Sequence, residues 1–270
     1  MVFSYQKNNR YFAQVADGME DLGRAELIAL GASEVKPTFR GIYFSADMAA
    51  LMRINYTARI ITRVLAPLIS FDCHSTKYLY KTARTIPWSG IFSLDNTFVI
   101  SANVSNSKIR HSQYASLVLK DAIVDSFREE CDERPYVARI DADICFNLHI
   151  SNNRATIYLD TSGGSLHRRG YRQASVEAPM QETLAAAIIS MSQWDGSTPL
   201  FDPMCGSGTL LCEALMHYCN IPSGYLRKNF GFTFLPEYDK SLWKSLRKEE
   251  GAKIRALPKG LISGSDASSD

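Results

Sequence analysis

The stretch that decides the fold of the C-terminal third is Phe201-Asp202-Pro203-Met204-Cys205-Gly206-Ser207-Gly208-Thr209-Leu210. The apolar residues before it predict the end of a short buried strand, and the run 210–216 after it predicts a helix. A strand that turns through glycines into a helix places backbone N–H groups and a helix N-terminus beside a ligand. Gly206 and Gly208 allow a close approach, because glycine tolerates φ values that other residues avoid. The stretch therefore predicts a nucleotide-cofactor turn.

Several interpretations of this turn compete. A phosphate-binding P-loop requires Lys after its last glycine, and Thr209 stands there. A dinucleotide fingerprint requires a third glycine where this chain has Leu211. In an S-adenosylmethionine turn, an acid at the end of the strand accepts a hydrogen bond from the cofactor's ammonium group, and Asp202 occupies that position. An ordinary strand–turn–helix with two incidental glycines is the remaining alternative.

Two further motifs stand upstream of the turn, Leu166-His167-Arg168-Arg169-Gly170-Tyr171-Arg172 and Glu177-Ala178-Pro179-Met180-Gln181-Glu182-Thr183-Leu184-Ala185. Together with 202–209 they resemble, in the same order, the RNA guanine-N2 methyltransferases that carry a THUMP domain, the family that includes the bacterial 23S rRNA enzyme. The resemblance covers essentially the whole chain. It implies S-adenosylmethionine as the cofactor and RNA as the partner.

The composition is that of a globular protein. Of 270 residues, 46% are hydrophobic and 21% are charged, which suits about two domains. The formal net charge of +2 is too small to indicate nucleic-acid binding by itself. Residues 1–10 contain no signal-peptide core, and no run of about 18 apolar residues exists, so we expect no membrane association. Six Cys without a CxxC pair predict reduced thiols in a cytoplasmic protein without a bound metal.

The N-terminal region is predicted to be α+β. A strand, a helix, two short strands and a second helix within 1–65 suggest a ferredoxin-like domain. Mixed strands and helices within 66–162 resemble a THUMP RNA-binding domain. The expected elements there include a helix from about Ala115 and a strand over Tyr136–Ile140.

A polar, basic stretch before that helix is the candidate RNA site of the second domain. Cations can hold phosphates there, and an aromatic ring can stack on an unpaired base. A solvated basic loop is the alternative. The candidate residues are Lys108, Arg110, His111, Gln113 and Tyr114.

Thr161-Ser162-Gly163-Gly164-Ser165 marks the boundary to a third domain over 163–270. The residues just after this linker suit RNA, because guanidinium groups pair with phosphates and a ring can stack. An interdomain clamp with nearby carboxylates is the equal alternative. These residues are Arg168, Arg169, Tyr171 and Arg172.

The third domain is predicted to be an incomplete α/β Rossmann-like methyltransferase domain that stops after its second strand. Asp266 ends that strand, where an acid can bind ribose hydroxyls. Glu182 and Thr183 begin a helix that, by the resemblance, faces the cofactor. The expected cofactor residues are Glu182, Thr183, Asp202, Pro203, Cys205, Gly206, Ser207, Gly208, Thr209 and Asp266.

The catalytic loop implied by the resemblance, of Asn-Pro-Pro-Tyr type, does not occur in this sequence. We therefore assign no catalytic residue and expect a fragment that is inactive alone. The predicted function of the whole protein is methylation of guanine N2 in 23S rRNA. The alternatives are guanine N2 in tRNA, an adenine amino group in DNA, or RNA binding without catalysis.

Overall fold

The computed structural model describes residues 2–138, 141–172 and 179–267. The chain divides into two compact units. Unit 1 contains Met1–Phe12, Val64–Gly164 and Asn229–Tyr238, and unit 2 contains Ala13–Arg63, Ser165–Lys228 and Asp239–Asp270. The boundary after Gly164 falls in the predicted linker, whereas most of the expected first and third domains share unit 2. The division into three domains stays a prediction.

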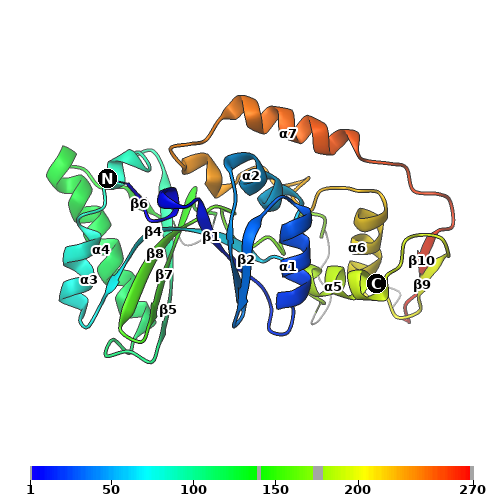
Figure 1. Ribbon diagram of the computed structural model, residues 1–270, viewed down its shortest axis with the longest axis horizontal. Coiled ribbons are helices and arrows are strands. Elements are labelled where there is room, and N and C mark those ends of the chain that lie inside the picture. The colour runs from blue at the N-terminus through cyan, green and yellow to red at the C-terminus, as the bar shows by residue number, and fades with distance from the viewer. Residues whose placement is uncertain (1, 139–140, 173–178, 268–270) are drawn as a thin grey trace. The chain divides into compact units, whose positions relative to one another are not determined.

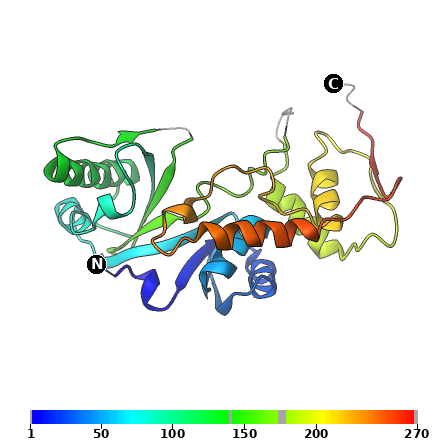
Figure 2. The same ribbon diagram turned by 90° about the horizontal axis from the view of Figure 1, so that it is seen from above.

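Unit 1 is built on strands in the order β4 (Arg63–Asp72), β8 (Arg154–Asp160), β7 (Ile144–Ser151), β5 (Thr97–Ser105) and β6 (Tyr136–Val137). Strands β7 and β8 form an antiparallel hairpin, and β5 runs parallel to β7 with Phe98 opposite Ile144. Helices α3 (Thr76–Ala83) and α4 (Ser112–Cys131) pack together on one face of this sheet (Figures 1 and 2). This arrangement is the expected α+β fold.

Alternating apolar residues form the core of unit 1. Every second residue of β7 from Ile144 to Ile150 is buried, as a half-buried strand requires. The ring of Trp88 meets Phe146 edge to face at 5.1 Å, and its indole N–H donates to the Ala83 carbonyl. Burial of this large ring is therefore combined with a satisfied donor.

A short segment from late in the chain, Asn229–Tyr238, belongs to unit 1. Its 3-10 helix, η3 (Gly231–Phe234), follows Phe230, whose ring stacks on Phe232 at 5.1 Å. A Cβ on Gly231 would lie 1.9 Å from the Asp160 carbonyl oxygen, so this position requires glycine.

Unit 2 begins with the ferredoxin-like elements. They are α1 (Glu20–Ala29), β2 (Ser33–Thr38) paired antiparallel with β3 (Gly41–Ser45), and α2 (Met48–Thr57). Strand β1 (Arg10–Gln14) spans the boundary between the units. The Glu26 carboxylate accepts hydrogen bonds from the backbone N–H groups of Arg59, Ile60 and Ile61. Burial nevertheless raises the pKa of Glu26, against the opposite effect of these N–H groups.

The rest of unit 2 has the α/β pattern. Helix α5 (Glu182–Ser192) packs on α6 (Thr209–Tyr218), and β9 (Leu200–Asp202) pairs in parallel with β10 (Ile262–Gly264) (Figure 1). Helix α7 (Lys240–Ala252) lies against α2. A parallel pair joined by a long helical crossover is the expected start of a Rossmann-like sheet.

Two predicted elements differ from the structure. Helix α4 starts at Ser112 and not at Ala115, because the polar residues of its first turn keep their side chains in solvent. The predicted strand over 136–140 is confirmed for Tyr136 and Val137 and ends before Ala138, whereas Arg139 and Ile140 lie outside the described residues. Glu177 and Ala178 of the upstream motif lie outside them as well.

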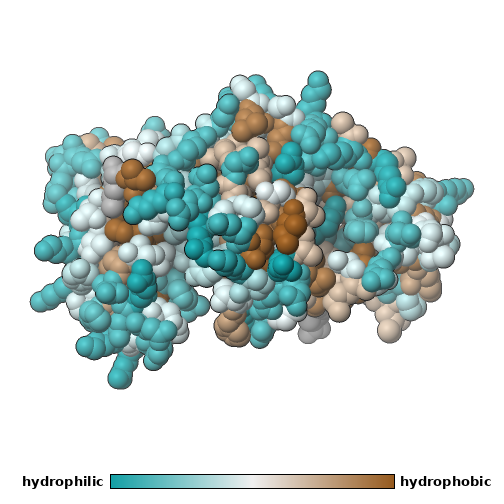
Figure 3. Space-filling model, viewed as in Figure 1, coloured by the Kyte–Doolittle hydropathy of each residue, from teal (hydrophilic) through white to brown (hydrophobic). Residues whose placement is uncertain are grey.

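The face seen in Figure 3 carries both hydrophilic and apolar residues. Hydrophilic residues are spread over the whole face seen in Figure 3, and the apolar ones form separate spots. Within the described residues, no helix has both the length and the apolar character needed to cross a membrane.

Candidate cofactor site

The turn between β9 and α6 has the geometry expected of a cofactor turn. Gly206 and Gly208 have φ values of 50° and 74°, in the left-handed region that favours glycine. A Cβ on either glycine would meet no protein atom within 4 Å, so the described part of the chain leaves open space above the turn. Gly208 directly precedes the first residue of α6, Thr209, which is buried. The turn thus presents open backbone beside a helix N-terminus, which fits a nucleotide cofactor.

The two predicted acids both contact the turn. Asp202 ends β9, and its Oδ1 accepts the Met204 N–H at 3.1 Å. Asp266 follows β10, and its Oδ2 accepts the Gly206 N–H at 2.7 Å. In the parallel pair, Asp202 lies opposite Gly264. This register brings Asp266 to Gly206, although the two residues are 60 positions apart in the sequence. A Cβ on Gly264 would lie 2.6 Å from Leu211 Cδ1, so this glycine allows the strand to lie close to α6.

Arg172 joins the turn to the start of α5. Its Nη1 donates to Ser207 Oγ at 3.0 Å, and its Nη2 donates to Thr209 Oγ1 at 3.0 Å. Its Nη2 also lies 3.2 Å from Glu182 Oε1, which is a salt bridge to a carboxylate that is 6% exposed. The structure therefore brings together three predicted cofactor residues through an arginine that was predicted to bind RNA. Arg172 thus pairs with a nearby carboxylate, as the alternative prediction had it, but within the predicted third domain and not between domains.

Arg169 forms a second, fully buried clamp. Its side chain is 1% exposed and its Nε lies 3.2 Å from Glu213 Oε1, on a residue of α6 that is 0% exposed. Its Nη1 and Nη2 donate to the carbonyls of Leu166 and Arg59 at 2.7 and 2.6 Å. The prediction that Arg169 contacts RNA is incompatible with this burial. The guanidinium instead ties the ferredoxin-like segment to α6 within unit 2.

Tyr171 completes this buried cluster. Its hydroxyl donates to Glu213 Oε1 at 3.0 Å. Burial raises the pKa of Tyr171, and the neighbouring Glu213 carboxylate raises it further. The Tyr171 hydroxyl is therefore a neutral donor engaged with Glu213 at physiological pH, whereas stacking of its ring on RNA stays a prediction. Of the four residues after the linker, Arg168 has the exposed side chain that an RNA contact needs.

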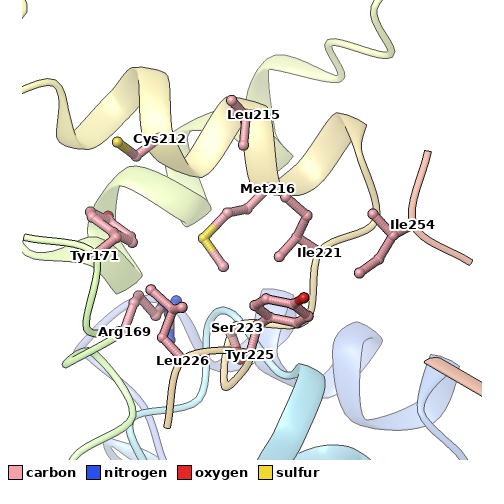
Figure 4. Close-up of a pocket in the computed structure, with 10 residues that line it drawn as sticks. All are labelled: Arg169, Tyr171, Cys212, Leu215, Met216, Ile221, Ser223, Tyr225, Leu226 and Ile254. Carbon is pink, nitrogen blue, oxygen red and sulfur yellow. The ribbon is translucent and has the colours of Figure 1, made fainter. Parts of the chain in front are cut away.

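An apolar cavity of about 300 Å³ adjoins the cluster. Side chains of α6 and of the following loop surround it in Figure 4, with Arg169 and Tyr171 at one side. Cys212 also lines this cavity. Burial, together with the Glu213 charge, raises the pKa of the Cys212 thiol, which therefore stays protonated at neutral pH.

The predicted RNA residues of unit 1 gather at the start of α4. Arg110, His111, Gln113 and Tyr114 line one hollow of about 490 Å³, and all four are exposed. Lys108 precedes the hollow, and its backbone N–H donates to Asn153 Oδ1. The structure thus places a ring, two cationic or titratable side chains and an amide around one open depression, next to a helix N-terminus.

Sequence reasoning missed the contributions of Glu213 and Arg59 to this region. Arg59 Nη2 donates to the Met216 and Ile221 carbonyls at 2.8 and 2.6 Å, at the end of α6. Glu213 carried a signal, because it is a single acid within the apolar run 210–216. A charge in the middle of a buried helix face requires a buried partner.

Comparisons with known proteins agree with this architecture. The family described as the RlmL ferredoxin-like domain matches residues 10–65, the THUMP domain matches 73–160, and the RMKL-like methyltransferase domain matches 169–270. A Synechocystis sp. protein named "Putative RNA methyltransferase slr0064" is 41% identical over 95% of this chain and 67% of its own length.

Two solved structures have the same fold. A "predicted N6-adenine-specific DNA methylase" from Listeria monocytogenes has a TM-score of 0.81 at 28% identity. The protein SMU.472, solved in complex with SAH, has a TM-score of 0.81 at 27% identity. Each alignment covers 96% of this chain and 68% of the other protein. SAH is the product that S-adenosylmethionine leaves after methyl transfer. The chain belongs to the RMKL-like family of S-adenosylmethionine-dependent RNA methyltransferases that carry a THUMP domain.

Proposed function

We propose that the protein methylates N2 of a guanine in 23S rRNA, and that these 270 residues supply its RNA-binding part and the first part of its cofactor site. The observation that carries the proposal is the glycine turn, with open backbone at Gly206 and Gly208 and an acid at the end of each adjoining strand. The choice of guanine and of rRNA rests on the family that the three sequence motifs resemble.

In this proposal, the two acids divide the recognition of the cofactor. Asp202 accepts a hydrogen bond from the ammonium group, and Asp266 accepts hydrogen bonds from the ribose hydroxyls. The cofactor, when bound, supplies the methyl group as an electrophile on its sulfonium sulfur. Asp266 also accepts the Gly206 N–H, which holds the turn before the cofactor arrives. Such preorganisation lowers the cost of binding.

The proposed RNA contacts are Lys108, Arg110, His111, Gln113 and Tyr114 in unit 1 and Arg168 in unit 2. The exposed cations can hold phosphates, and the Tyr114 ring, which is 56% exposed, can stack on a base. Because the RNA base must reach a methyl group, we propose that catalysis depends mainly on positioning, with the base taken out of its helix.

A methyl-transfer assay tests the proposal. The full-length protein is incubated with labelled S-adenosylmethionine and transcripts of 23S rRNA and tRNA, and the product nucleosides are identified by mass spectrometry. We expect N2-methylguanosine in the rRNA. Methylation of tRNA alone would move the substrate to the tRNA alternative, and incorporation into neither RNA would overturn the proposal.

We further propose that these 270 residues alone do not transfer a methyl group, because no Asn-Pro-Pro-Tyr-type tetrapeptide occurs in them. The same assay with the 270-residue chain tests this point. Calorimetric titration with S-adenosylmethionine shows whether the glycine turn binds the cofactor without the catalytic loop. Methylation at the rate of the full-length protein would overturn this part.

A further inference from the structure

Helix α7 carries a row of cations that its own stability does not explain. Lys240, Lys244, Arg247 and Lys248 are exposed, and within the described residues none of them has an ion-pair partner. At 3.6 residues per turn these four lie within an arc of roughly 100° on the helix surface. We call these four residues the α7 cation stripe.

Between its caps, Asp239 and Lys253, helix α7 has a charge order opposite to the one that favours a helix. Cations occupy the N-terminal turns, beginning with Lys240 in the first turn, whereas Glu249 and Glu250 lie near the C-terminus. The positive end of the helix dipole disfavours cations at the N-terminus and favours carboxylates there. Lys240, Lys244 and Lys248 also repel one another at spacings of four residues. The exposed cations between the caps thus break a local rule without an ion-pair partner among the described residues, which is typical of a functional site.

The two carboxylates of α7 are engaged elsewhere. Arg53 contacts Glu249 at 3.4 Å and Glu250 at 3.0 Å, and Lys253 contacts the same pair at 3.2 and 2.8 Å. Negative charge on this helix is therefore neutralised at its C-terminal end, and the stripe keeps its full positive charge.

The opposite side of α7 is packed firmly. Leu246 is 3% exposed, and the Trp243 ring meets Tyr56 of α2 edge to face at 5.2 Å. The Arg247 guanidinium lies 5.8 Å from the Trp243 ring centre, so its orientation is supported by a cation–π contact. Asp239 caps the helix by accepting from the N–H groups of Ser241 and Leu242. The stripe thus projects from a rigid element.

We propose that the α7 cation stripe is a second RNA-binding surface, which holds phosphates of the substrate. Its three lysines are about 6 Å apart along the helix and span about 12 Å, enough to contact several phosphates of one strand. Ser241 and Ser245 are exposed on the same helix and can donate to phosphate oxygens. The inference rests on the RNA substrate of the proposed function, and it adds a contact outside the THUMP segment.

The test compares two triple variants of the full-length protein with the same change in charge. One is Lys240→Gln/Lys244→Gln/Lys248→Gln. The matched control is Lys7→Gln/Lys36→Gln/Lys77→Gln, at exposed lysines outside the stripe. Affinity for a fluorescein-labelled, mixed-sequence single-stranded RNA is measured by anisotropy over a series of salt concentrations.

We expect the stripe variant to bind more weakly, with the slope of log K against log salt reduced by about 2, since each lost phosphate contact contributes about 0.7 on a single strand. The control should change the slope by less than half of that. Thermal melting should show no loss of stability for the stripe variant. Lys244→Glu should melt at the same or a higher temperature, because it relieves the lysine repulsion, and still bind RNA more weakly.

Equal effects of the two triple variants, or an unchanged slope for the stripe variant, would overturn the proposal that the α7 cation stripe binds RNA. Neither result would contradict the proposed methyltransferase function. Absence of RNA binding by the wild-type protein would overturn both. If the stripe variant keeps RNA affinity but loses binding to phosphatidylglycerol vesicles, the stripe contacts membranes and the proposal is wrong.

Discussion

Replacement of Arg169 by Met tests whether the buried clamp holds unit 2 together. The substitution removes three hydrogen bonds, to Glu213, Leu166 and Arg59. Within the described residues, the Oε1 atom of Glu213, a residue that is 0% exposed, then keeps the Tyr171 hydroxyl as its remaining donor. Removal of one partner from a buried ion pair costs about 3–5 kcal/mol. A domain is stable by about 5–15 kcal/mol, so Arg169→Met should remove between about a fifth and all of that stability.

Urea unfolding, followed by tryptophan fluorescence and circular dichroism, measures this loss. Trp194 and Trp243 lie in unit 2 and report on it. The double variant Arg169→Met/Glu213→Leu should recover much of the loss, because neither charge is then left alone. Two carbonyls and the Tyr171 hydroxyl still lose partners, so a deficit of about 1–3 kcal/mol should remain.

Arg168→Met is the matched control, since the neighbouring arginine is exposed, and it should stay within about 0.5 kcal/mol of the wild type. A loss below about 1 kcal/mol for Arg169→Met, or strictly additive single and double variants, would refute the reasoning.

Three further outcomes follow from the geometry around the turn. Arg172→Lys keeps the charge beside Glu182 but loses the fork to Ser207 and Thr209, so S-adenosylmethionine affinity of the full-length protein, measured by calorimetry, should fall about tenfold. Gly208→Ala should cost about 1–2 kcal/mol in urea unfolding, because its φ is 74°. Gly251→Ala, at the next-to-last residue of α7, should instead gain up to about 0.5 kcal/mol, because a helix end gains less than a helix interior. Burial lowers the pKa of His167 below its ordinary 6.5. The unfolded chain therefore binds a proton at this ring more readily than the folded one, and the folded state loses stability as the pH falls below 6.5. His167→Gln should flatten the decline of Tm below pH 6.5.

The glycine turn and its acids were predictable because the signals are local. Gly206, Gly208 and Asp202 lie within one short stretch, and Asp266 follows the next apolar strand. The contact between Gly206 and Asp266 then follows from parallel pairing of two strands, which the α/β pattern already implies. The strand and helix periodicity of the N-terminal region likewise predicted the α+β fold.

The roles of the arginines after the linker were not predictable from the sequence. Arg168, Arg169 and Arg172 are equivalent in type and lie within five positions, yet one is exposed and one is fully buried. Their difference depends on Glu182 and Glu213, which come from two later helices. Only packing between distant segments decides which guanidinium meets solvent. The place of η3 in unit 1 was not predictable either, because it depends on the close approach of Gly231 to the backbone of Asp160.

The interleaved order of the two units has a consequence for synthesis of the chain on the ribosome. Residues 13–63 emerge early, but their partners in unit 2 begin at Ser165, after the 101 residues of Val64–Gly164. At about 5–20 residues per second, the first segment waits roughly 5–20 s for them. Unit 1 also lacks η3 until residues 229–238 emerge. Neither unit can complete its core during most of translation. Residues 13–63 must therefore keep their local fold until residue 165 emerges, and the hydrogen bonds from the N–H groups of 59–61 to the Glu26 carboxylate stabilise that fold.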